Sequence, residues 1–570
     1  MKIYAMKKVF FTFVIIVLAM SLDCQPAKND IEFDNGSNII FPELDRQTID
    51  NLELLGKLWG FLKYHHPEIG KGNYNWDYEL FRILPEYLQV TDKKQRDQVL
   101  ISWINKYGKI PACKSCQKTS DNAYLKPNLT WLEDSDVGKI LKNKVKEIYQ
   151  NRHQGKHYYI SMALSVGNPK FLNENEYSNM SYPDQGFRLL ALYRFWSTIQ
   201  YFYPYKYLTD TDWDIILKEY IPKFLEASNG LEYELVALQL IGEINDTHAG
   251  VGLRWQKVGE SRGYRFAPFR VQFIENELIV TEYFNPELQE ISKLQVGDII
   301  THIAGKSVGK IIDSLKIYYP ASNDASQKRD IAFNILRSSQ PSIEIQYISD
   351  SLNKEMTLML YKSDSLNLFK ECTEKSYRIL DENIGYITLR TIKNKDIPAI
   401  KESLKNTKGI IIDIRNGVSE FVPYTLGSYF VSKSTPFAKS TIGNINNPGE
   451  FRFSTIQPIS KGKEVYQGKL VVLVNEFTQS MGEFIAMAFR AGENTTIVGT
   501  TTAGTDGDVS IISLPGGLKM YISGIGIYYP DGSETQRVGI IPDIYIEPTI
   551  EGIKSGRDEV LEKAIEIINK

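Results

Sequence analysis

An internal duplication constrains the N-terminal half of this chain more than any other feature of the sequence. A pattern of alternating tryptophan and proline returns 137 positions later (196 − 59) without a gap, as Trp59, Pro67, Trp76, Pro85 and then Trp196, Pro204, Trp213, Pro222. Each copy combines helical apolar spacing, a proline-marked turn and a Trp-Asp pair at the start of a second helix. We therefore expect two related helical units, over residues 45–145 and 180–258, that pack against each other.

The sequence pattern changes twice further along the chain. Short strand-like runs fill residues 262–362, whereas strands alternate with helices over 376–550, and an amphipathic helix lies within 551–570. Such alternation is typical of a parallel or mixed sheet covered by helices. A length of 570 residues implies about three or four domains. The net charge of -3, with no long block of like charge, argues against a nucleic-acid groove.

The first residues are typical of an export signal. Three lysines precede an apolar run from Val9 to Leu22, which is too short to span a bilayer about 30 Å thick. We expect residues 1–24 to be a signal peptide and the protein to be exported to the periplasm or cell envelope. Cys24 is a candidate for lipidation and outer-membrane attachment, but the preceding Ser21-Leu22-Asp23 matches lipoprotein signals poorly, so both outcomes stay open.

Two pairs of potential ligands, Cys113 with Cys116 and His65 with His66, do not predict a metal site. Zinc sites need a second CxxC or a histidine pair at ligand spacing. A redox-active pair is one alternative for the cysteines, but a local disulfide is favoured in an oxidising compartment, which leaves Cys372 as a lone, buried thiol. We expect the two histidines to lie in a solvated turn. No metal or cofactor is expected.

Ser480 carries the strongest chemical signal because it lies between a strand and a helix. Leu470 to Val474 is uniformly apolar, as in a buried strand, and apolar residues from Phe484 onward have helical spacing. Unpaired N–H groups at a helix start carry partial positive charge, which would stabilise an oxyanion formed there. Alternatively, Ser480 and Glu483 form a capping box that needs no catalysis. Taken alone, Ser480 favours the second explanation.

His248 is the best candidate for the base that a nucleophilic serine needs. It follows the second helical copy, in INDTHAGV, and the chain has only six histidines. The duplicated position in the first copy is Pro111 (248 − 137), so only the second copy can supply a base. On residue type alone, His248 is equally compatible with a satisfied core histidine at a helix exit.

Several motifs occur together in the C-terminal half: GYITLR, GIIIDIRN, VVLVNEFTQSMGE, IVGTTTAG and GIIPDI. With the helical region before them, they resemble the S41 family of serine peptidases, which includes the tail-specific or C-terminal processing proteases and the tricorn core protease. The resemblance covers roughly residues 185–547 and implies a crotonase-like ββα catalytic domain over 376–550. Within 262–362, LQVGDII followed by IAGK resembles PDZ domains, which bind a peptide as an added strand.

The expected fold class is therefore multidomain α+β, with a duplicated N-terminal helical region, a PDZ-like β domain and a crotonase-like catalytic domain. The family has two catalytic arrangements. In the processing proteases a lysine follows T-x-G, and here Thr505 stands in its place. In the tricorn-like branch the base is a histidine preceded by a hydroxyl residue, here Thr247-His248, and an acidic fourth residue is replaced here by Gln536.

The resemblance implies acyl transfer without a metal or cofactor. His248 deprotonates Ser480, which attacks the carbonyl of a polypeptide, while Thr247, held by Gln536, fixes the imidazole. The backbone amides of Met481 and Gly417 bind the oxyanion. Because an amide adds no charge to stabilise an imidazolium, we expect either a functional but slower site or a charge supplied by Glu483 or Glu534.

The sequence thus predicts an exported serine endopeptidase that captures polypeptide ends through its PDZ domain. A catalytically silent protein that binds peptides or an apolar ligand is the alternative, supported by Gln536 and by the missing lysine. An esterase-type α/β hydrolase is disfavoured, because Thr478-Gln479-Ser480-Met481-Gly482 lacks the first glycine of the G-x-S-x-G turn.

Overall fold

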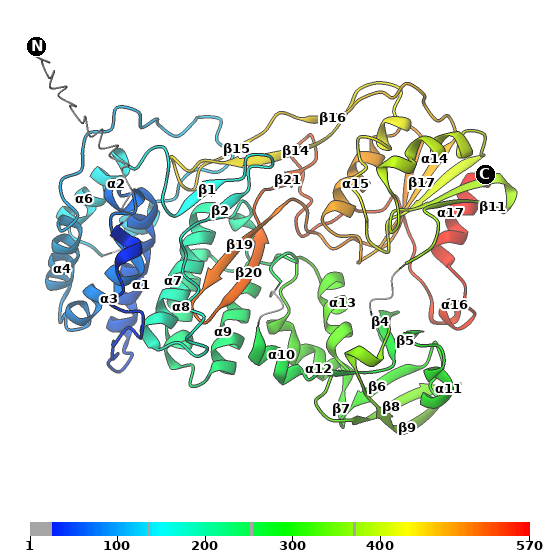
Figure 1. Cartoon of the computed structure of the whole chain (residues 1–570), viewed down its shortest axis with the longest axis horizontal. Helices are drawn as coiled ribbons and strands as arrows, with labels where there is room; N and C mark the ends of the chain where they lie inside the picture. The colour runs from blue at the N-terminus through cyan, green and yellow to red at the C-terminus, as the bar shows by residue number, and fades with distance from the viewer. Residues whose placement is uncertain (1–25, 135, 251–254, 369–371) are drawn as a thin grey trace, which may run out of the picture.

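The computed structural model describes residues 26–134, 136–250, 255–368 and 372–570. The expected signal peptide and Cys24 therefore lie outside the described residues. Three regions follow one another along the chain (Figure 1): a helical region, a smaller β domain and a domain built on a mixed sheet. Among the helices of the described residues, none combines the length and the apolar character needed to cross a membrane.

The duplicated sequence forms two helix pairs of the same design. The paired helices are α1 (Arg46–His65) with α3 (Trp76–Tyr87), and α7 (Gln185–Phe202) with α8 (Trp213–Glu226). In each pair two tryptophans exchange hydrogen bonds: each indole N–H donates to the backbone carbonyl of the other residue, at 3.0 and 2.9 Å for Trp59 and Trp76, and at 2.8 and 3.0 Å for Trp196 and Trp213. All four side chains are buried, so each reciprocal pair of hydrogen bonds satisfies two indole donors that would otherwise be unpaired.

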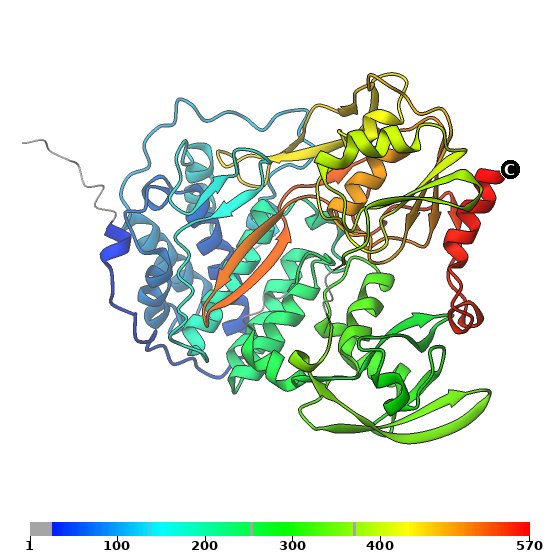
Figure 2. The same ribbon diagram turned by 45° about the vertical axis from the view of Figure 1, so that its right-hand side comes forward.

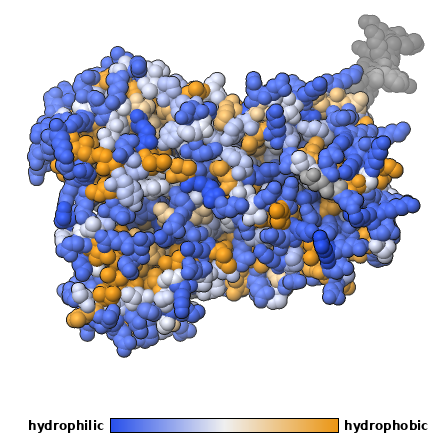
Figure 3. All heavy atoms as spheres, turned by 180° about the vertical axis from the view of Figure 1, so that it is seen from behind, coloured by the Kyte–Doolittle hydropathy of each residue, from blue (hydrophilic) through white to orange (hydrophobic). Residues whose placement is uncertain are grey.

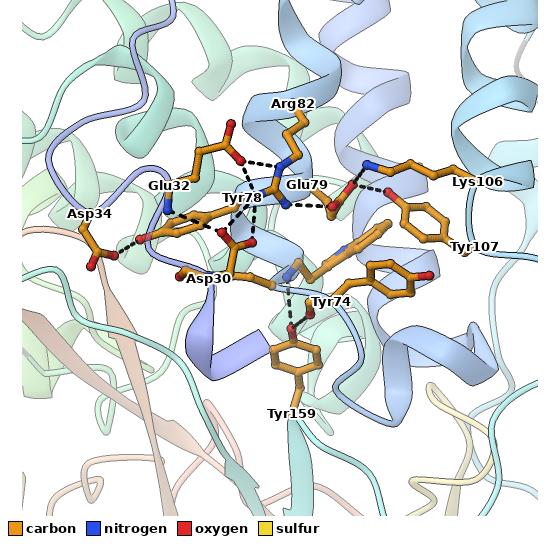
Figure 4. A network of polar contacts seen from close by, with 12 residues as sticks. Asp30, Glu32, Asp34, Tyr74, Tyr78, Glu79, Arg82, Lys106, Tyr107 and Tyr159 are labelled. Carbon is orange, nitrogen blue, oxygen red and sulfur yellow. Dashed lines mark hydrogen bonds and ion pairs between the residues drawn. The ribbon is translucent and has the colours of Figure 1, made fainter. Parts of the chain in front are cut away.

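Shorter elements complete the helical region. They are α2 (Pro67–Gly70), α4 (Lys93–Asn105), α5 (Thr130–Asp134), α6 (Lys139–Gln150), α9 (Gly230–Gly242), α10 (Gln256–Arg262) and the hairpin β1 (Ile160–Met162) with β2 (Pro169–Phe171). The segment before α1 is tied to α3 by Arg82, which binds Asp30, Glu32 and Glu79 (Figure 4). The N-terminal segment is thus an ordered part of the helical region from residue 26 onward.

The expectation of a solvated turn at His65-His66 is wrong. Both rings are fully buried. His65 closes α1, stacks on Phe61 and bonds its carbonyl through Nδ1 at 2.8 Å, while His66 Nδ1 accepts the N–H of Glu68 at the start of α2. Burial lowers the pKa of His65 to about 3 and that of His66 to about 4, so both rings are neutral at physiological pH.

The structure agrees with one of the two expectations for the cysteines, the disulfide, and differs on the burial of Cys372. Cys113 and Cys116 form the local disulfide that the sequence favoured. Cys372 is a free thiol, but it is only half-buried, because it lies in the short connection after the β domain rather than in a core.

Residues 262–362 form a six-stranded antiparallel sheet with its own core. The strand order is β4 (Phe269–Ile274), β5 (Glu277–Tyr283), β6 (Ile299–Ile303), β8 (Ser342–Ser349) and β9 (Leu352–Met359), and the short β7 (Lys306–Ser307) pairs with β6. The helices are α11 (Leu288–Ser292), α12 (Val308–Leu315) and α13 (Asp324–Asn334). β4 is an edge strand of this sheet, and α13 packs beside it. Seen from behind, this β domain exposes several apolar patches (Figure 3).

The third region is built on a six-stranded sheet. Its order is β11 (Tyr377–Leu380), β12 (Ile384–Thr388), β13 (Gly409–Asp413), β17 (Lys469–Val474), β18 (Thr495–Gly499) and β22 (Ile544–Tyr545); β11 is antiparallel to β12 and the other neighbours are parallel. Helices α14 (Ile397–Leu404), α15 (Met481–Arg490), α16 (Ile550–Lys554) and α17 (Glu559–Asn569) accompany it. Uninterrupted burial of β13 and of Leu470–Val474 explains their continuous apolar sequence.

Two excursions of the chain join this domain to the helical region. One is the sheet of β14 (Thr435–Gly443) with β15 (Phe451–Phe453), β16 (Gln457–Ile459) and β21 (Ile527–Tyr528). The other is the hairpin of β19 (Val509–Leu514) and β20 (Leu518–Ser523), which lies among the N-terminal helices in both ribbon views (Figures 1 and 2). Apolar side chains of this hairpin belong to the helical core, although the sequence assigned residues 376–550 to a single domain. The hairpin brings Ser523 beside the end of α9.

Candidate active site

Ser480 stands at a strained strand-to-helix turn. It follows β17 and precedes α15, and its backbone has φ 55° and ψ −117°. Ordinary N-cap residues have extended backbone angles with negative φ, so capping alone does not account for this conformation. Strain of this kind, held in place by surrounding structure, clusters at functional sites, and a nucleophilic serine at a sharp strand-to-helix turn is one known case.

The loop 502–507 covers the Ser480 turn. The Ser480 N–H donates to the carbonyl of Thr505 at 2.9 Å, and the Ser480 hydroxyl donates to the carbonyl of Gly507 at 3.4 Å. No hydrogen bond joins the Ser480 hydroxyl to His248 in the described part of the chain. Ser480 and Glu483 also form the capping box that the sequence offered as the alternative. The hydroxyl is half-buried, and its bond to Gly507 is long.

Glu483 fixes that loop and does not serve the imidazole. It is buried, and its carboxyl accepts from the amides of Ser480 at 3.2 Å, Gly504 at 2.8 Å and Thr505 at 3.0 Å, and from the Thr502 hydroxyl. Burial raises the pKa of Glu483 to about 7 despite these four donors. The expectation that Glu483 supplies charge to His248 is therefore not supported by its contacts.

His248 lies on the loop that follows α9, where its imidazole meets two hydroxyls. Nδ1 is 2.9 Å from Ser523 Oγ on β20 and 3.0 Å from Thr505 Oγ1. Burial lowers the pKa of His248, while the negative charges of Asp246 and Asp508 act in the opposite direction. The ring is thus a neutral base in a partly desolvated position, which is the state that general-base catalysis requires.

Thr505 connects the two candidate catalytic residues. Its carbonyl binds the amide of Ser480, and its hydroxyl contacts the ring of His248. The side chain is fully buried. From sequence, this residue was notable only as the replacement for a lysine; in the structure it brings two segments more than 230 positions apart (480 − 248) into one site.

The roles expected for Thr247 and Gln536 change in the structure. The amide of Thr247 donates to Ser322 Oγ at 2.9 Å, and the amide of Ser322 donates to Thr247 Oγ1 at 2.8 Å, a reciprocal pair at the start of α13. The side-chain amide of Gln536 donates to the Asp246 carboxylate at 3.3 Å and to Ser322 Oγ at 3.4 Å. Among the described residues no hydrogen bond joins Gln536 to Thr247, whose hydroxyl contacts Ser326 Oγ at 3.0 Å and donates to the carbonyl of Ala503 at 3.1 Å.

Glu534 is also displaced from its expected role. Its carboxyl accepts hydrogen bonds from Tyr207 at 2.6 Å and Tyr124 at 3.5 Å, within a cluster of tyrosines. Burial raises its pKa. These contacts belong to the junction between the helical region and β21, so Glu534 is not in contact with the imidazole.

The two expected oxyanion donors lie on neighbouring loops. Met481 is the first residue of α15, and Gly417 follows β13 with φ 89°. A methyl group built at Gly482 would lie 3.8 Å from the side chain of Val418, which places the Gly417 loop against the first turn of α15. Among the described residues, neither amide donates to a protein acceptor. Both are thus open to a substrate oxygen.

A cleft of about 1500 Å³ leads from the β domain toward this site. One wall is formed by β4 and by one face of α13. The other wall is the carboxyl edge of the parallel sheet, with the residues that follow β13, β17, β18 and β22, among them Gly417 and Phe477. In parallel sheets this edge is where ligands bind.

Three residues of the site were missed by sequence reasoning: Asp246, Thr505 as a contact of the base, and Ser523. Asp246 was visible two positions before His248, but a capped helix exit explained it equally well. Ser523 carried no signal, because it belongs to a hairpin that reaches His248 only through the packing of β19 and β20 into the helical core.

The fold and the site are those of a serine-type hydrolase: a strained serine follows a central parallel strand, and Thr505 contacts both this serine and a histidine. Residues 383–546 match the model of peptidase family S41.

The similar proteins agree with this assignment. The carboxy-terminal-processing protease of Bartonella bacilliformis is 25% identical over 196 residues, which cover 32% of this chain and 43% of that protein. The matched part is thus less than half the length of this curated relative. Among solved structures, mature CPAF is 16% identical with a TM-score of 0.54, covering 68% of this chain and 98% of that chain. The structure of mature CPAF complexed with lactacystin is 15% identical with a TM-score of 0.54, covering 68% of this chain and 99% of that chain. At these identities the likeness concerns the fold.

Proposed function

We propose that this protein is a serine endopeptidase that cleaves polypeptides through an acyl-enzyme on Ser480, with His248 as the base. The observation that supports this most is the double contact of Thr505, which binds the Ser480 amide and the His248 ring. The proposal requires that rotation of the serine side chain brings Ser480 Oγ within about 2.6–3.2 Å of the His248 ring.

The proposed reaction follows from which groups are already engaged. Nδ1 of His248 is occupied by two hydroxyls, so Nε2 is the nitrogen that accepts the Ser480 proton. Ser480 Oγ leaves the Gly507 carbonyl and attacks the scissile carbonyl carbon, and the Met481 and Gly417 amides bind the oxyanion. The imidazolium then protonates the leaving amine, and a water molecule hydrolyses the acyl-enzyme by the same route.

The test is the variant Ser480→Ala beside the matched control Ser314→Ala, an exposed serine of the β domain. Ser480→Ala should lower kcat on an unstructured polypeptide by on the order of 10⁶-fold and abolish labelling by a fluorophosphonate. Ser314→Ala should behave as wild type. Cleavage by Ser480→Ala at the wild-type rate would show that another residue is the nucleophile.

We also infer that the β domain acts as a PDZ-type module that captures the substrate chain. Edge strand β4 lies beside α13 on one wall of the cleft, and the carboxyl edge of the parallel sheet forms the opposite wall. An extended peptide can add to such an edge as a further strand. The cleft then directs the peptide toward the carboxyl edge of the sheet, where Gly417 lies. Binding of a fluorescent peptide to the Ser480→Ala variant measures this capture.

A catalytically silent peptide-binding protein is the second candidate. It is favoured by one observation: the Ser480 hydroxyl bonds to Gly507 and not to His248. Absence of fluorophosphonate labelling in the wild type, with peptide binding retained, would establish it.

Export to the periplasm or cell envelope is proposed from the N-terminal sequence alone. Recovery of the full-length protein in the cytoplasmic fraction would contradict it, and a mass consistent with the bare Cys24 thiol would exclude lipidation.

A further inference from the structure

A stabilising charge for the imidazolium is missing at position 536, where the family pattern has an acid and this chain has an amide. Asp246 is the acidic side chain closest to the base by its contacts. It is fully buried, and its two oxygens accept five hydrogen bonds. The donors are the amide of His248 at 3.0 Å, the amide of Ser523 at 2.7 Å, the hydroxyls of Thr505 at 2.7 Å and Ser523 at 3.1 Å, and the side chain of Gln536 at 3.3 Å.

The direction of these bonds fixes the tautomer of His248. A carboxylate only accepts, so the hydroxyls of Thr505 and Ser523 direct their hydrogens toward Asp246. Their lone pairs then face Nδ1, at 3.0 and 2.9 Å. Nδ1 must therefore carry the ring hydrogen, and Nε2 keeps the lone pair that a general base needs. The same geometry places the negative charge one hydroxyl away from the ring.

We infer that Asp246 is the positioning acid of this site, acting on His248 through the hydroxyls of Thr505 and Ser523, in place of the side chain at position 536. The inference rests on the proposed roles of Ser480 and His248 and deepens them. Gln536 then has a different role. Its side-chain amide donates to both the Asp246 carboxylate and the Ser322 hydroxyl, and so helps to hold Asp246 in position.

Other charged groups around the ring provide a control. Asp508, on the loop before β19, also favours the charged form of His248, but it is exposed and its carboxyl caps only the amide of Val509 at 2.9 Å. Glu483 and Asp506 lie deeper in the loop 502–507, where burial raises the pKa of both. Removing the charge of Asp508 thus changes the field at His248 without changing its hydrogen bonds.

The first experiment compares Asp246→Asn with Asp508→Asn in pH profiles of kcat/KM. Asp246→Asn should lower the plateau by on the order of 10²-fold or more. The NH2 group of the new asparagine would face at least one of the groups that donate to Asp246, and this would disturb the tautomer of His248. Loss of the negative charge should also move the acidic limb to lower pH, since the His248 pKa falls. Asp508→Asn should keep the plateau within about twofold. Equal plateaus for the two variants would overturn the inference.

Two further variants guard against a simple folding defect. Thr505→Val keeps the shape and removes one relay hydroxyl, and Thr505→Ser restores it; kcat should fall in the first and recover in the second, with unchanged circular dichroism. Histidine NMR gives a readout independent of turnover: the His248 pKa should fall more in Asp246→Asn than in Asp508→Asn. An unlabelled, inactive wild type would refute the proposed peptidase, whereas this pKa comparison would still decide the role of Asp246.

The sharpest experiment relocates the acid. Gln536→Glu places a second carboxylate about 3.3 Å from Asp246, so like charges should lower activity. In the double variant Asp246→Asn with Gln536→Glu, the carboxylate in this hydrogen-bond network is moved to the position of the family pattern, and activity should rise at least tenfold over Asp246→Asn alone. A gain of activity in Gln536→Glu alone would show that wild type lacks its acid and that Asp246 does not supply it.

Discussion

The buried carboxyl of Glu483 makes the stability of the catalytic turn depend on pH, and Glu483→Gln should remove that dependence. In the folded protein the pKa of Glu483 is raised by burial from 4.5 to about 7. The folded state therefore holds its proton more tightly than the unfolded state. Stability from this group is fully present below pH 4.5 and is lost as the pH rises through 7.

The magnitude follows from the two pKa values. A rise from 4.5 to about 7 corresponds to roughly 3 kcal/mol of unfolding free energy lost between about pH 4.5 and pH 8. Asp506 contributes in the same direction, because burial and the charge of Glu483 both raise its pKa. Glu483→Gln removes the contribution of Glu483 and reduces that of Asp506. The unfolding free energy of wild type minus that of the variant should therefore fall by roughly 3 kcal/mol between about pH 4.5 and pH 8.

Hydrogen–deuterium exchange of α15 is the suitable assay. All seven tryptophans precede residue 256, so intrinsic fluorescence would report on the helical region instead of this turn. Wild type and variant are compared at each pH, which cancels the intrinsic exchange rate and leaves the local opening free energy. Glu402→Gln, at an exposed carboxyl on α14, is the control and should show no trend. A difference constant within about 0.5 kcal/mol from pH 5 to 8 would refute the desolvation argument.

Two other substitutions test the cleft and the hairpin. Lys328→Trp, in the cleft on α13, should raise KM for a long polypeptide severalfold and leave kcat on a short peptide unchanged, whereas Lys354→Trp on β9 should alter neither; equal KM values would remove the cleft from substrate capture. Tyr233→Phe leaves the Pro515 carbonyl without its buried partner at 2.7 Å and should cost about 1–3 kcal/mol of unfolding free energy. The matched control Tyr182→Phe loses a bond of the same length to Ala227 at an exposed site and should cost less; equal losses would contradict the role of burial.

The sequence was informative wherever the determinant of structure was local or repeated. The tryptophan pattern predicted two related helix pairs, and its physical basis is the exchange of indole hydrogen bonds, which needs the same spacing in both copies. The uniformly apolar run before Ser480 predicted a buried central strand, because only burial on both faces tolerates such a run. The histidine pair at the C-terminal end of α1 was misjudged, because the packing of α1 against the rest of the helical region buries a turn whose sequence is polar.

The polar contacts of the site could not be predicted, because they join residues from separate regions. His248 comes from the helical region, Thr505 from the loop after β18 and Ser523 from a hairpin that leaves the catalytic sheet for the helical core. Ser322, at the start of α13, adds a contact from the β domain through Thr247. Motif resemblance could name positions, but the direction of each hydrogen bond was set by this packing.

The replacement of the family lysine by Thr505 is best explained as part of the histidine arrangement and not as a loss. A lysine at this position would remove the hydroxyl that donates to Asp246 at 2.7 Å and would bring a positive charge into this part of the site. A positive charge near His248 opposes formation of the imidazolium. A hydroxyl instead donates to Asp246 and accepts from Nδ1 at once. Under the proposed mechanism, the residue that replaces the lysine of one catalytic arrangement is thus a contact of the base in the other.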